Sequence, residues 1–484
     1  MKDTLKTEVV EAWNTNLAFE SWDGSLNDER DSVRQKAKGS KKHLREIPPD
    51  IRPADKGFKA LNTAENLRWL LHSKNLKAAM NLLNFQPELV NLSDFMPNGS
   101  DAQDVESDII SEANKAGLPE NVINHLGKIA KDLQIHPVKT LLDGHTWDGI
   151  HRLADVLDCV PVAPEDVEKR NAIITATLIA AIAALYDGEV SMKTVMTLYS
   201  EQNDYHKTAF LRCLGDILPG AFAEGVAIAD PHNKDQKRRA LSHWFVELGE
   251  VDQMQRSEAG ALKAFIPLSE DAWRPEYKSY QVTKKRQTVF AATVNVQTFI
   301  KDSTTASRFP VIELIGPIDI GRVNRILGWE LVRGAPKLAR QELLIQFWLE
   351  IRDRYHNGET YSLNPVMLET VKATNDRYID KGNYYDSVRE LLLKDDPQIV
   401  DVNGKIIVGR ESHEGNGARF CAADLCRTLR IDARFNRQVG KAIAELVKDG
   451  VVEKFMSKTG KRQAIQYYRI TDAVLTEKLC KRPV

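Results

Sequence analysis

The chain has 484 residues, enough for about three domains of ordinary size. Hydrophobic residues make up 42% of it and charged residues 28%, as in an ordinary soluble protein. The 67 Lys+Arg and 68 Asp+Glu residues leave a net charge of −1, which excludes a chain that attracts polyanions over its whole surface. Any affinity for an anionic partner must therefore come from local basic patches.

Cysteine usage and hydropathy predict an intracellular protein without a membrane role. The five cysteines form no C-x-x-C pair, which is typical of reduced, structural thiols in a cytosol. The N-terminus has no apolar core of signal-peptide length. The apolar run 172–186 is shorter than the roughly 18–20 residues of a membrane span, so we expect a buried core helix there.

The first third of the chain is predicted to hold a polar arm and a helical domain. Residues 1–60 are charge-mixed and contain Pro and Gly, which favours a flexible arm over a DNA-contacting tail. Apolar residues then recur at helical spacing from Asn62, and a second helical stretch follows the break at Pro97–Ser100. We expect a helical domain over residues 61–160.

The middle of the chain alternates between β-like and helix-like stretches. This alternation predicts a parallel α/β sheet over residues 161–335, of the size of a P-loop nucleotide-binding core. The expected strands are 194–199, 221–228, 244–248, 288–294 and 309–314.

The last third is predicted to be a helical connector over residues 336–400 and a winged-helix domain over residues 401–484. The order helix, helix, β-hairpin is that of a winged helix-turn-helix. From Ala418 to Val484 there are 15 Lys+Arg against 7 Asp+Glu, a local excess of +8 that favours contacts with DNA phosphates. A solvated basic helix face is the alternative. The candidate DNA contacts are Arg430, Arg434, Arg437, Lys441, Lys458, Lys461 and Arg462.

The stretch Leu198–Leu211, LYSEQNDYHKTAFL, lies where a phosphate-binding loop belongs, between a strand and a helix. Such a loop reads G-x-x-x-x-G-K-[ST], and its Lys and hydroxyl contact phosphates and Mg²⁺. Here the Lys-Thr pair is present but both glycines are missing. Strict spacing places Glu201 and His206 at the glycine positions, and one extra residue places Ser200 first. Both registers are open, as is the alternative that the Lys-Thr pair is a coincidence.

Several motifs in this region resemble the virulence-associated protein E family and, through it, the superfamily III-like helicases of phages and mobile elements. The motifs are HPVKTLLDGHTWDGIHRL (His136–Leu153), WFVELGEVD (Trp244–Asp252), LKAFIPLSEDAWRPEY (Leu262–Tyr277), KRQTVFAATVN (Lys285–Asn295) and DSTTASRFPVIEL (Asp302–Leu314). Their order and spacing run unbroken over about 180 residues. The resemblance implies an AAA+-like P-loop NTPase core, and it does not extend to residues 1–60 or to the C-terminal tail.

The resemblance also implies roles for individual residues of the core. Lys207 and Thr208 would contact ATP and its Mg²⁺, helped by Ser200 and His206. Glu247 would be the Walker B acid that shares the metal with Thr208, and Glu250 would lie close behind it.

Three further residues complete the implied site. Asn295 would be the sensor that positions the attacking water, Arg308 the arginine finger that reaches the phosphate of a neighbouring subunit, and Arg274 a second basic contact to ATP. The implied assembly is a ring, a hexamer, that uses ATP to translocate on single-stranded or origin DNA.

The departures from the family pattern cluster on ATP contacts. The loop has no glycine, Ser307 replaces the first arginine of the finger motif, and TTN has become TVN at the sensor. Two functions therefore stay open. The first is a phage, prophage or satellite replication helicase, and the second is an ATPase-inactive DNA-binding or assembly protein on the same scaffold.

Overall fold

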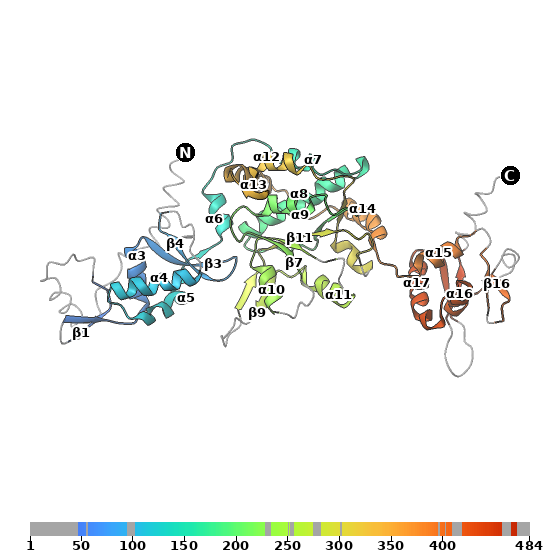
Figure 1. The fold of residues 1–484 in the computed structure, drawn as a ribbon, viewed down its shortest axis with the longest axis horizontal. Helices are drawn as coiled ribbons and strands as arrows, with labels where there is room; N and C mark the ends of the chain where they lie inside the picture. Colours follow the sequence, from blue (N-terminus) through green and yellow to red (C-terminus); the bar gives the residue numbers. More distant parts are fainter. Residues whose placement is uncertain are drawn as a thin grey trace. The chain divides into compact units, whose positions relative to one another are not determined.

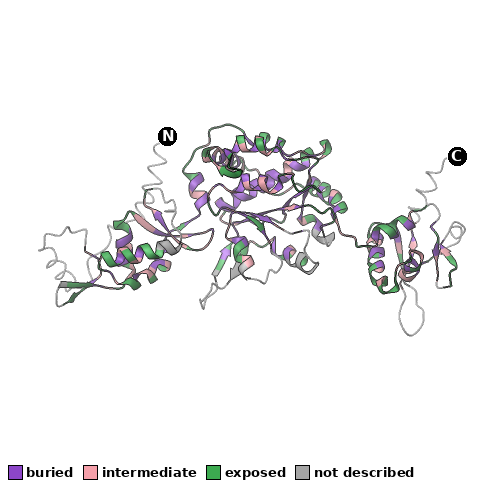
Figure 2. Ribbon diagram, in the orientation of Figure 1, coloured by how far each residue is buried: buried purple, intermediate pink, exposed green. Residues whose placement is uncertain are grey.

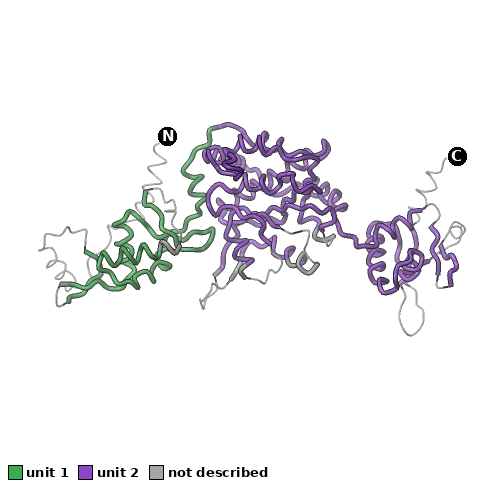
Figure 3. Tube along the Cα trace, in the orientation of Figure 1, with its two compact units in different colours: residues 1–148 green, residues 149–484 purple. Residues whose placement is uncertain are grey.

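The structure is a computed structural model that divides into two compact units, residues 1–148 and 149–484 (Figure 3). It describes residues 47–54, 57–93, 102–227, 234–249, 251, 256–273, 282–300, 303–394, 397–401, 403–408, 419–456 and 466–471.

The first unit combines helices with a small three-stranded sheet. Its strands β3 (Leu76–Asn81), β4 (Pro87–Asn91) and β5 (Gln134–Ile135) are ordered β4-β3-β5, with β4 antiparallel and β5 parallel to β3. A separate hairpin joins β1 (Ile51–Ala54) to β2 (Gly57–Ala60). The helical elements are α3 (Ala64–Ser73), α4 (Ala102–Lys115), η3 (Glu120–His125), α5 (Leu126–Ile129), η4 (Ala130–Asp132) and α6 (Pro137–Asp143).

This unit corrects two expectations. The helical pattern from Asn62 covers one helix and one strand, because α3 ends at Ser73 and Asn75 takes the left-handed conformation at φ 59° before β3 begins. Residues 51–54 and 57–60, expected to lie in a flexible arm, form the antiparallel strands β1 and β2 instead. The buried Asn66 side chain ties this hairpin to α3 through hydrogen bonds to the backbone of Asp50 and Leu61.

The second unit is built on a five-stranded parallel sheet, as the alternating sequence pattern predicts. Its order is β12-β6-β11-β8-β7, and every neighbouring pair is parallel. The strands are β6 (Met196–Tyr199), β7 (Phe222–Val226), β8 (Phe245–Leu248), β11 (Val289–Val294) and β12 (Val311–Glu313).

Helices cover both faces of this sheet. Figure 1 shows α8 (Val167–Tyr186) and α9 (Lys207–Gly215) on one face, and α10 (Lys234–Leu241) and α11 (Arg256–Phe265) on the other. On the α9 face, Gly215 lies so close to Phe222 and Phe245 that a methyl group there would come within 2.8 Å of Phe222. The helices α7 (Leu153–Asp158), α12 (Ile320–Leu327), α13 (Gln341–His356) and α14 (Pro365–Asn375) complete this part of the unit.

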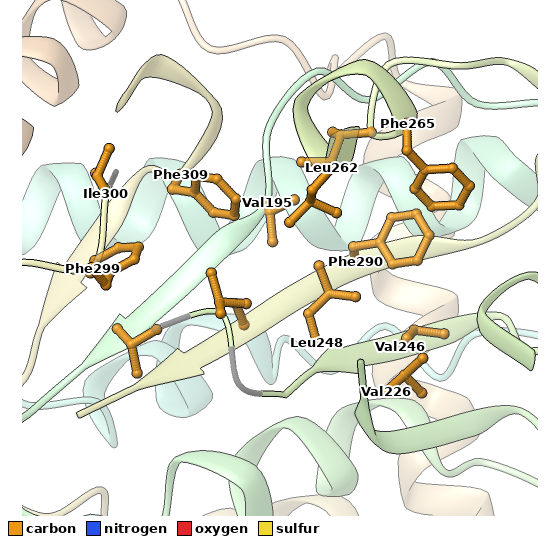
Figure 4. Packing of buried hydrophobic residues seen from close by; sticks show 14 of the residues in the cluster. Val195, Val226, Val246, Leu248, Leu262, Phe265, Phe290, Phe299, Ile300 and Phe309 are labelled. Atoms are coloured by element: carbon orange, nitrogen blue, oxygen red, sulfur yellow. The ribbon is translucent and has the colours of Figure 1, made fainter. Parts of the chain in front are cut away.

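The core on the α10–α11 face is formed by alternate residues of the strands. Figure 4 shows Val246 and Leu248 of β8 beside Phe290 of β11, with Leu262 and Phe265 of α11 packed on them. Figure 2 shows the buried residues gathered on the strands and on the inner faces of the helices. Because successive residues of a strand point to opposite faces, Glu247 must face α9.

The apolar run at residues 172–186 is the greater part of α8. By length and composition a helix over Pro164–Tyr186 could cross a membrane, but 78% of its most apolar window is buried inside the protein. Trp244 donates its indole N–H to Ala181 O of this helix at 2.8 Å. It is therefore a buried core helix, as expected.

Two hairpins beside the sheet had no counterpart in the expected elements. They pair β9 (Glu270–Trp273) with β10 (Val282–Lys285), and β13 (Trp329–Val332) with β14 (Ala335–Leu338). The turn of the second hairpin places Arg333 and Gly334 at positive φ, which is the two-residue geometry that suits the twist of a hairpin.

The C-terminal part of the second unit has its own hydrophobic cluster. Helix α15 (Tyr385–Leu392), expected to lie in the connector, contributes four buried residues to this cluster and packs against α17 (Asn436–Lys448). Phe420 forms a bridge to Tyr468, which extends the antiparallel pair of β17 (Val452–Met456) and β18 (Gln466–Ile470). The remaining elements are β15 (Ile399–Val400), β16 (Ile406–Val408), α16 (Ala422–Thr428) and η9 (Ala433–Phe435).

Candidate nucleotide-binding site

The glycine-free loop lies where the connections of two neighbouring strands diverge. From β6 the chain leads toward β7 at one edge of the sheet, and from β11 it leads to β12 at the other edge. In open α/β sheets ligands bind at such a switch point, outside the carboxyl ends of the strands. Ser200 follows β6 and Asn295 follows β11, so both residues lie at this point.

The Lys207 ammonium group joins the ends of these two strands. It donates to Ser200 Oγ at 2.6 Å, to Asn295 Oδ1 at 2.5 Å and to Gln202 O at 3.1 Å, with Ser200 O at 3.3 Å. Lys207 is only 5% exposed. The oxygen acceptors around its ammonium group offset the cost of burying this charge. Two of the predicted residues, Ser200 and Asn295, thus meet around the predicted cation Lys207.

A second contact joins the helix to the neighbouring strand. Thr208 Oγ1 donates to Glu247 Oε1 at 2.6 Å, and Thr293 Oγ1 of β11 donates to the same oxygen at 2.7 Å. Glu247 is 2% exposed. The hydroxyl and the carboxylate that were expected to share a metal ion are therefore adjacent, and the Thr293 contact was not foreseen from the sequence.

His206 takes a left-handed backbone conformation, which glycine adopts most easily. Its φ of 59° and ψ of 25° lie in the left-handed region, directly before the first residue of α9. A left-handed residue followed by a right-handed turn directs successive N–H groups toward one point, which suits an anion. The side chain of His206 makes no capping hydrogen bond to α9.

The acidic residues of the loop are exposed, and Glu201 Oε1 accepts a hydrogen bond from the Tyr199 hydroxyl group at 3.4 Å. Glu201, Asn203 and Asp204 are exposed, whereas Ser200 is buried. Water screens the repulsion between exposed carboxylates and a bound anion. Ser200, and not Glu201, is the residue that contacts Lys207, in agreement with the register that has one extra residue.

Arg308 lies at the opposite end of the sheet. It closes the 3-10 turn η6 (Ser303–Arg308), is half-exposed, and donates through Nη1 to Lys193 O at 3.2 Å. Val195, just before β6, donates its N–H to Arg308 O at 2.7 Å. Five residues separate Val195 from Ser200, roughly 16 Å along a strand, so Arg308 is remote from the Lys207 site of its own chain.

Tyrosine–carboxylate pairs flank the carboxyl ends of β6 and β12. Tyr378 donates to Glu313 Oε2 at 2.8 Å, and Arg377 pairs with the same carboxylate at 2.6 Å. Burial, together with nearby Glu201 and Glu313, raises the pKa of Tyr199 to about 12. Burial and the contact with Glu313 raise the pKa of Tyr378 as well. Both phenols are therefore hydrogen-bond donors at any physiological pH.

Two buried cations, Arg286 and Lys284, bind backbone carbonyls at helix ends. Arg286 donates to the carbonyls of Phe265 and Ile266 at 2.6 and 2.9 Å, and Lys284 donates to Leu241 O. Each contact satisfies carbonyls at the C-terminal end of a helix, α11 and α10 respectively. The arginine of the KRQTVFAATVN motif thus holds a helix in place.

Other candidate residues either are apart from this site or lie outside the described residues. In the C-terminal module, by which we mean the elements from α15 to β18, four predicted DNA contacts are exposed: Arg430, Arg434, Arg437 and Lys441. The Arg434 guanidinium group lies 4.8 Å from the centre of the Phe435 ring. The candidates outside the described residues are Glu250, Arg274, Lys458, Lys461 and Arg462.

Three solved structures of one protein region resemble the chain. The apo structure of the NrS-1 C-terminal region (305–718) is 11% identical, covers 84% of this chain and 99% of that chain, and has a TM-score of 0.46. An A-form apo structure of that region is 12% identical, with 84% and 98% covered and a TM-score of 0.44. A further A-form structure is 13% identical, with 84% and 99% covered and a TM-score of 0.39. No curated protein matches the chain.

Residues 142–380 match the family model of the virulence-associated protein E-like domain. The matched range contains the strand β6, the loop with Lys207, and the segments that carry Glu247, Asn295 and Arg308. The chain therefore contains a virulence-associated protein E-like domain, which confirms the family that the sequence motifs indicated.

Proposed function

We propose that this protein is a replication ATPase of a phage or mobile element, a helicase that binds ATP at the Lys207 loop and moves on DNA. One observation carries the proposal: Lys207, Thr208, Glu247 and Asn295 come from three separate segments and meet in two hydrogen-bonded groups. Chance placement of a Lys-Thr pair does not account for a buried carboxylate and an amide at the ends of the two neighbouring strands.

In this proposal different residues around the loop bind the phosphate and orient the attacking water. The N–H groups at the start of α9 and the Lys207 ammonium group favour an anion, because a helix N-terminus carries partial positive charge. To reach a phosphate, Lys207 exchanges some of its four oxygen contacts for phosphate oxygens. Asn295 and Ser200 then become free to orient a water molecule beside the nucleotide.

Glu247 acts on that water as a base or as an orienting group. Glu247 lies near the end of the buried strand β8. Its Oε1 atom accepts both hydroxyl hydrogen bonds, and its second carboxylate oxygen, Oε2, takes part in neither of them. Thr208 and Glu247 also offer the hard oxygen atoms that Mg²⁺ prefers, so this pair fits the ion. When bound, Mg²⁺ would neutralise charge on the phosphate oxygens.

Arg308 serves the nucleotide of a neighbouring subunit in this proposal. Its position at the amino end of β6 favours action in trans, in a ring that we take to be a hexamer. An arginine supplied in this way stabilises the charge that develops on the transferred phosphoryl group.

The C-terminal module, in a winged-helix arrangement, would bind DNA. Arg437 and Lys441 are four residues apart on α17, so they share one exposed face of that helix. The contacts would be mainly to phosphates, and they would anchor the ring on single-stranded or origin DNA.

The test is equilibrium binding of ATP with Mg²⁺, followed by hydrolysis with and without single-stranded DNA. We expect micromolar binding by the wild type, loss of binding in Lys207→Ala, and binding without hydrolysis in Glu247→Gln. Binding and turnover that are unchanged in both variants would refute the proposal. Circular dichroism of each variant checks that the substitution has not unfolded the chain.

The second candidate function is a DNA-binding assembly protein that does not hydrolyse ATP. It is favoured by one observation, namely that Lys207 is already supplied with four oxygen contacts and holds β6 and β11 together without a ligand. Absence of binding at millimolar ATP, with DNA binding intact, would select this function. In that case Lys207→Ala should lower thermal stability while DNA binding persists.

A further inference from the structure

A buried asparagine holds the turn that carries Arg308. Asn375 is the last residue of α14 and its side chain is fully buried. Its Nδ2 donates to Ala306 O and to Phe309 O, each at 2.7 Å. The two carbonyls lie on either side of Arg308, so one amide group clamps the backbone around it.

The contacts define which end of the amide is used. Both partners are carbonyl oxygens, which only the NH₂ group can contact as a donor. The Oδ1 atom is buried and has no hydrogen-bond partner among the described residues. A buried acceptor without a partner costs stability. The contribution of Asn375 to the fold therefore comes from the two hydrogen bonds that its NH₂ group donates.

The opposite side of the turn is fixed by the segment before β6. Val195 N–H donates to Arg308 O at 2.7 Å, and Arg308 itself contacts Lys193 O at 3.2 Å. The backbone of the turn is thus held from two directions, and Arg308 as a residue is half-exposed. These contacts fix the backbone from which the Arg308 side chain extends.

We infer that Asn375 is a positioning residue for Arg308, which sets the direction in which the guanidinium group projects toward a second copy of the chain. The inference rests on the proposed function, because it gives Arg308 a phosphate in the next subunit. A reacting group displaced by about 1 Å can lose on the order of 100-fold in rate. Loss of the clamp should therefore reduce turnover by the neighbouring subunit and leave the local site intact.

The experiment uses mixtures of two full-length variants. Lys207→Ala has no working loop but can donate Arg308, and Arg308→Ala has a working loop but no arginine to donate. We expect the mixture to regain DNA-stimulated ATP hydrolysis that neither variant shows alone. Asn375→Leu, which keeps the approximate volume and removes both donors, is then added to one partner at a time.

The position of the added substitution distinguishes a positioning role from a structural role. Asn375→Leu on the Lys207→Ala partner should lower the regained rate by about 10- to 100-fold. The same substitution on the Arg308→Ala partner should leave the rate within about twofold, because that subunit donates no arginine. Equal losses on both partners, or no loss on either, would overturn the inference and leave the proposed function standing.

A matched control removes the cap at the other end of the same helix. Asn364 accepts the N–H of Met367 at 2.8 Å, at the start of α14 and thus at the end of the helix opposite to Asn375. Asn364→Ala on either partner should lower thermal stability without an asymmetric effect on the rate. If the original mixture regains no activity although the wild type hydrolyses ATP, action in trans fails and the inference fails with it. A wild type that does not hydrolyse ATP overturns the proposed function itself.

Discussion

At the scale of single residues, His206 takes a left-handed backbone conformation at the position where the pattern of a phosphate-binding loop has a glycine. A residue with a Cβ atom loses roughly 1–2 kcal/mol in the left-handed conformation, although His tolerates it better than most residues. The φ of 59° is therefore imposed by the junction between β6 and α9 and not by the residue.

A glycine at this position should stabilise the chain relative to alanine. We expect His206→Gly to unfold at a higher urea concentration than His206→Ala, by about 1 kcal/mol in the free energy of unfolding. Asn203, an exposed residue of the same loop without positive φ, is the control, and there glycine should be the less stable replacement. Equal stability of the two His206 variants would show that the left-handed conformation is not retained in solution.

Thr293 gives a second prediction at this scale, because its hydroxyl group supports the carboxylate of Glu247. Thr293→Val keeps the shape and removes one of the two hydrogen bonds to a buried carboxylate, which should cost about 1–3 kcal/mol of stability. ATP hydrolysis should fall, while ATP binding through Lys207 persists. Thr197→Val, on the neighbouring strand, removes a buried hydroxyl group that donates to the backbone carbonyl of Val195, and it should lower stability without changing the hydrolysis rate. A hydrolysis rate unaffected by Thr293→Val would exclude a supporting role.

At the scale of elements, the connection from α12 to β13 depends on a single glycine. Gly328 ends α12 at φ 84°, and a methyl group on it would lie 2.1 Å from Arg340 O. The two backbones approach because Ala339 and Arg340 both donate their N–H groups to Gly328 O. This close contact fixes the β13–β14 hairpin to the start of α13.

Alanine at this glycine should be far more harmful than alanine at a matched one. Gly328→Ala combines the conformational cost with a steric clash and should destabilise by more than about 3 kcal/mol. Gly358 also has positive φ, at 91°, but no atom lies within 4 Å of the added methyl position. Gly358→Ala should therefore cost only about 1–2 kcal/mol. Urea denaturation of the two variants measures the difference, and similar midpoints would contradict the close approach.

The elements of the second unit were predictable where the sequence alternates, and not where short hairpins interrupt it. The five strands were expected from their apolar runs, since strands buried on both faces read as continuous hydrophobic stretches. In the first unit, by contrast, strand β3 reads Leu-Lys-Ala-Ala-Met-Asn, which favours a helix by propensity. Pairing with β4 and β5 overrides that preference, and pairing between distant segments is not visible in local composition.

The candidate site was predictable in its residue types and not in its contacts. Lys207, Thr208, Glu247 and Asn295 could be proposed because the motifs around them resemble those of a phosphate-binding loop and of the virulence-associated protein E family, which assign each of them a role. Thr293 and Asn375 carry no such signal, since their roles depend on which segments the sheet brings together. A threonine one residue before the end of a strand gave no reason to expect a bond to a carboxylate on the next strand.

At the scale of the whole molecule, DNA binding should depend on salt through the C-terminal module. We expect the double substitution Arg437→Ala/Lys441→Ala to reduce the slope of log K against log salt by about 1.4, because each lost phosphate contact on single-stranded DNA removes about 0.7. Lys448→Ala is the control, because its ammonium group is paired with Glu445 at 2.9 Å and should contribute little. Fluorescence anisotropy of labelled single-stranded DNA from low to high salt measures the slopes. An unchanged slope in the double variant would place the DNA contacts elsewhere.

The strand order of the central sheet also has consequences for folding during synthesis and for the design of truncated fragments. Strand β6 pairs with β11 on one side and with β12 on the other, so its two partners are synthesised about a hundred residues after it. Contacts between such distant segments form slowly, and a strand with one open edge invites pairing with other chains. A fragment that ends before Glu313 would contain the loop with Lys207 but expose one edge of the strand that supports it. We therefore expect fragments that stop short of β12 to aggregate, and expression trials for nucleotide work should extend past that strand.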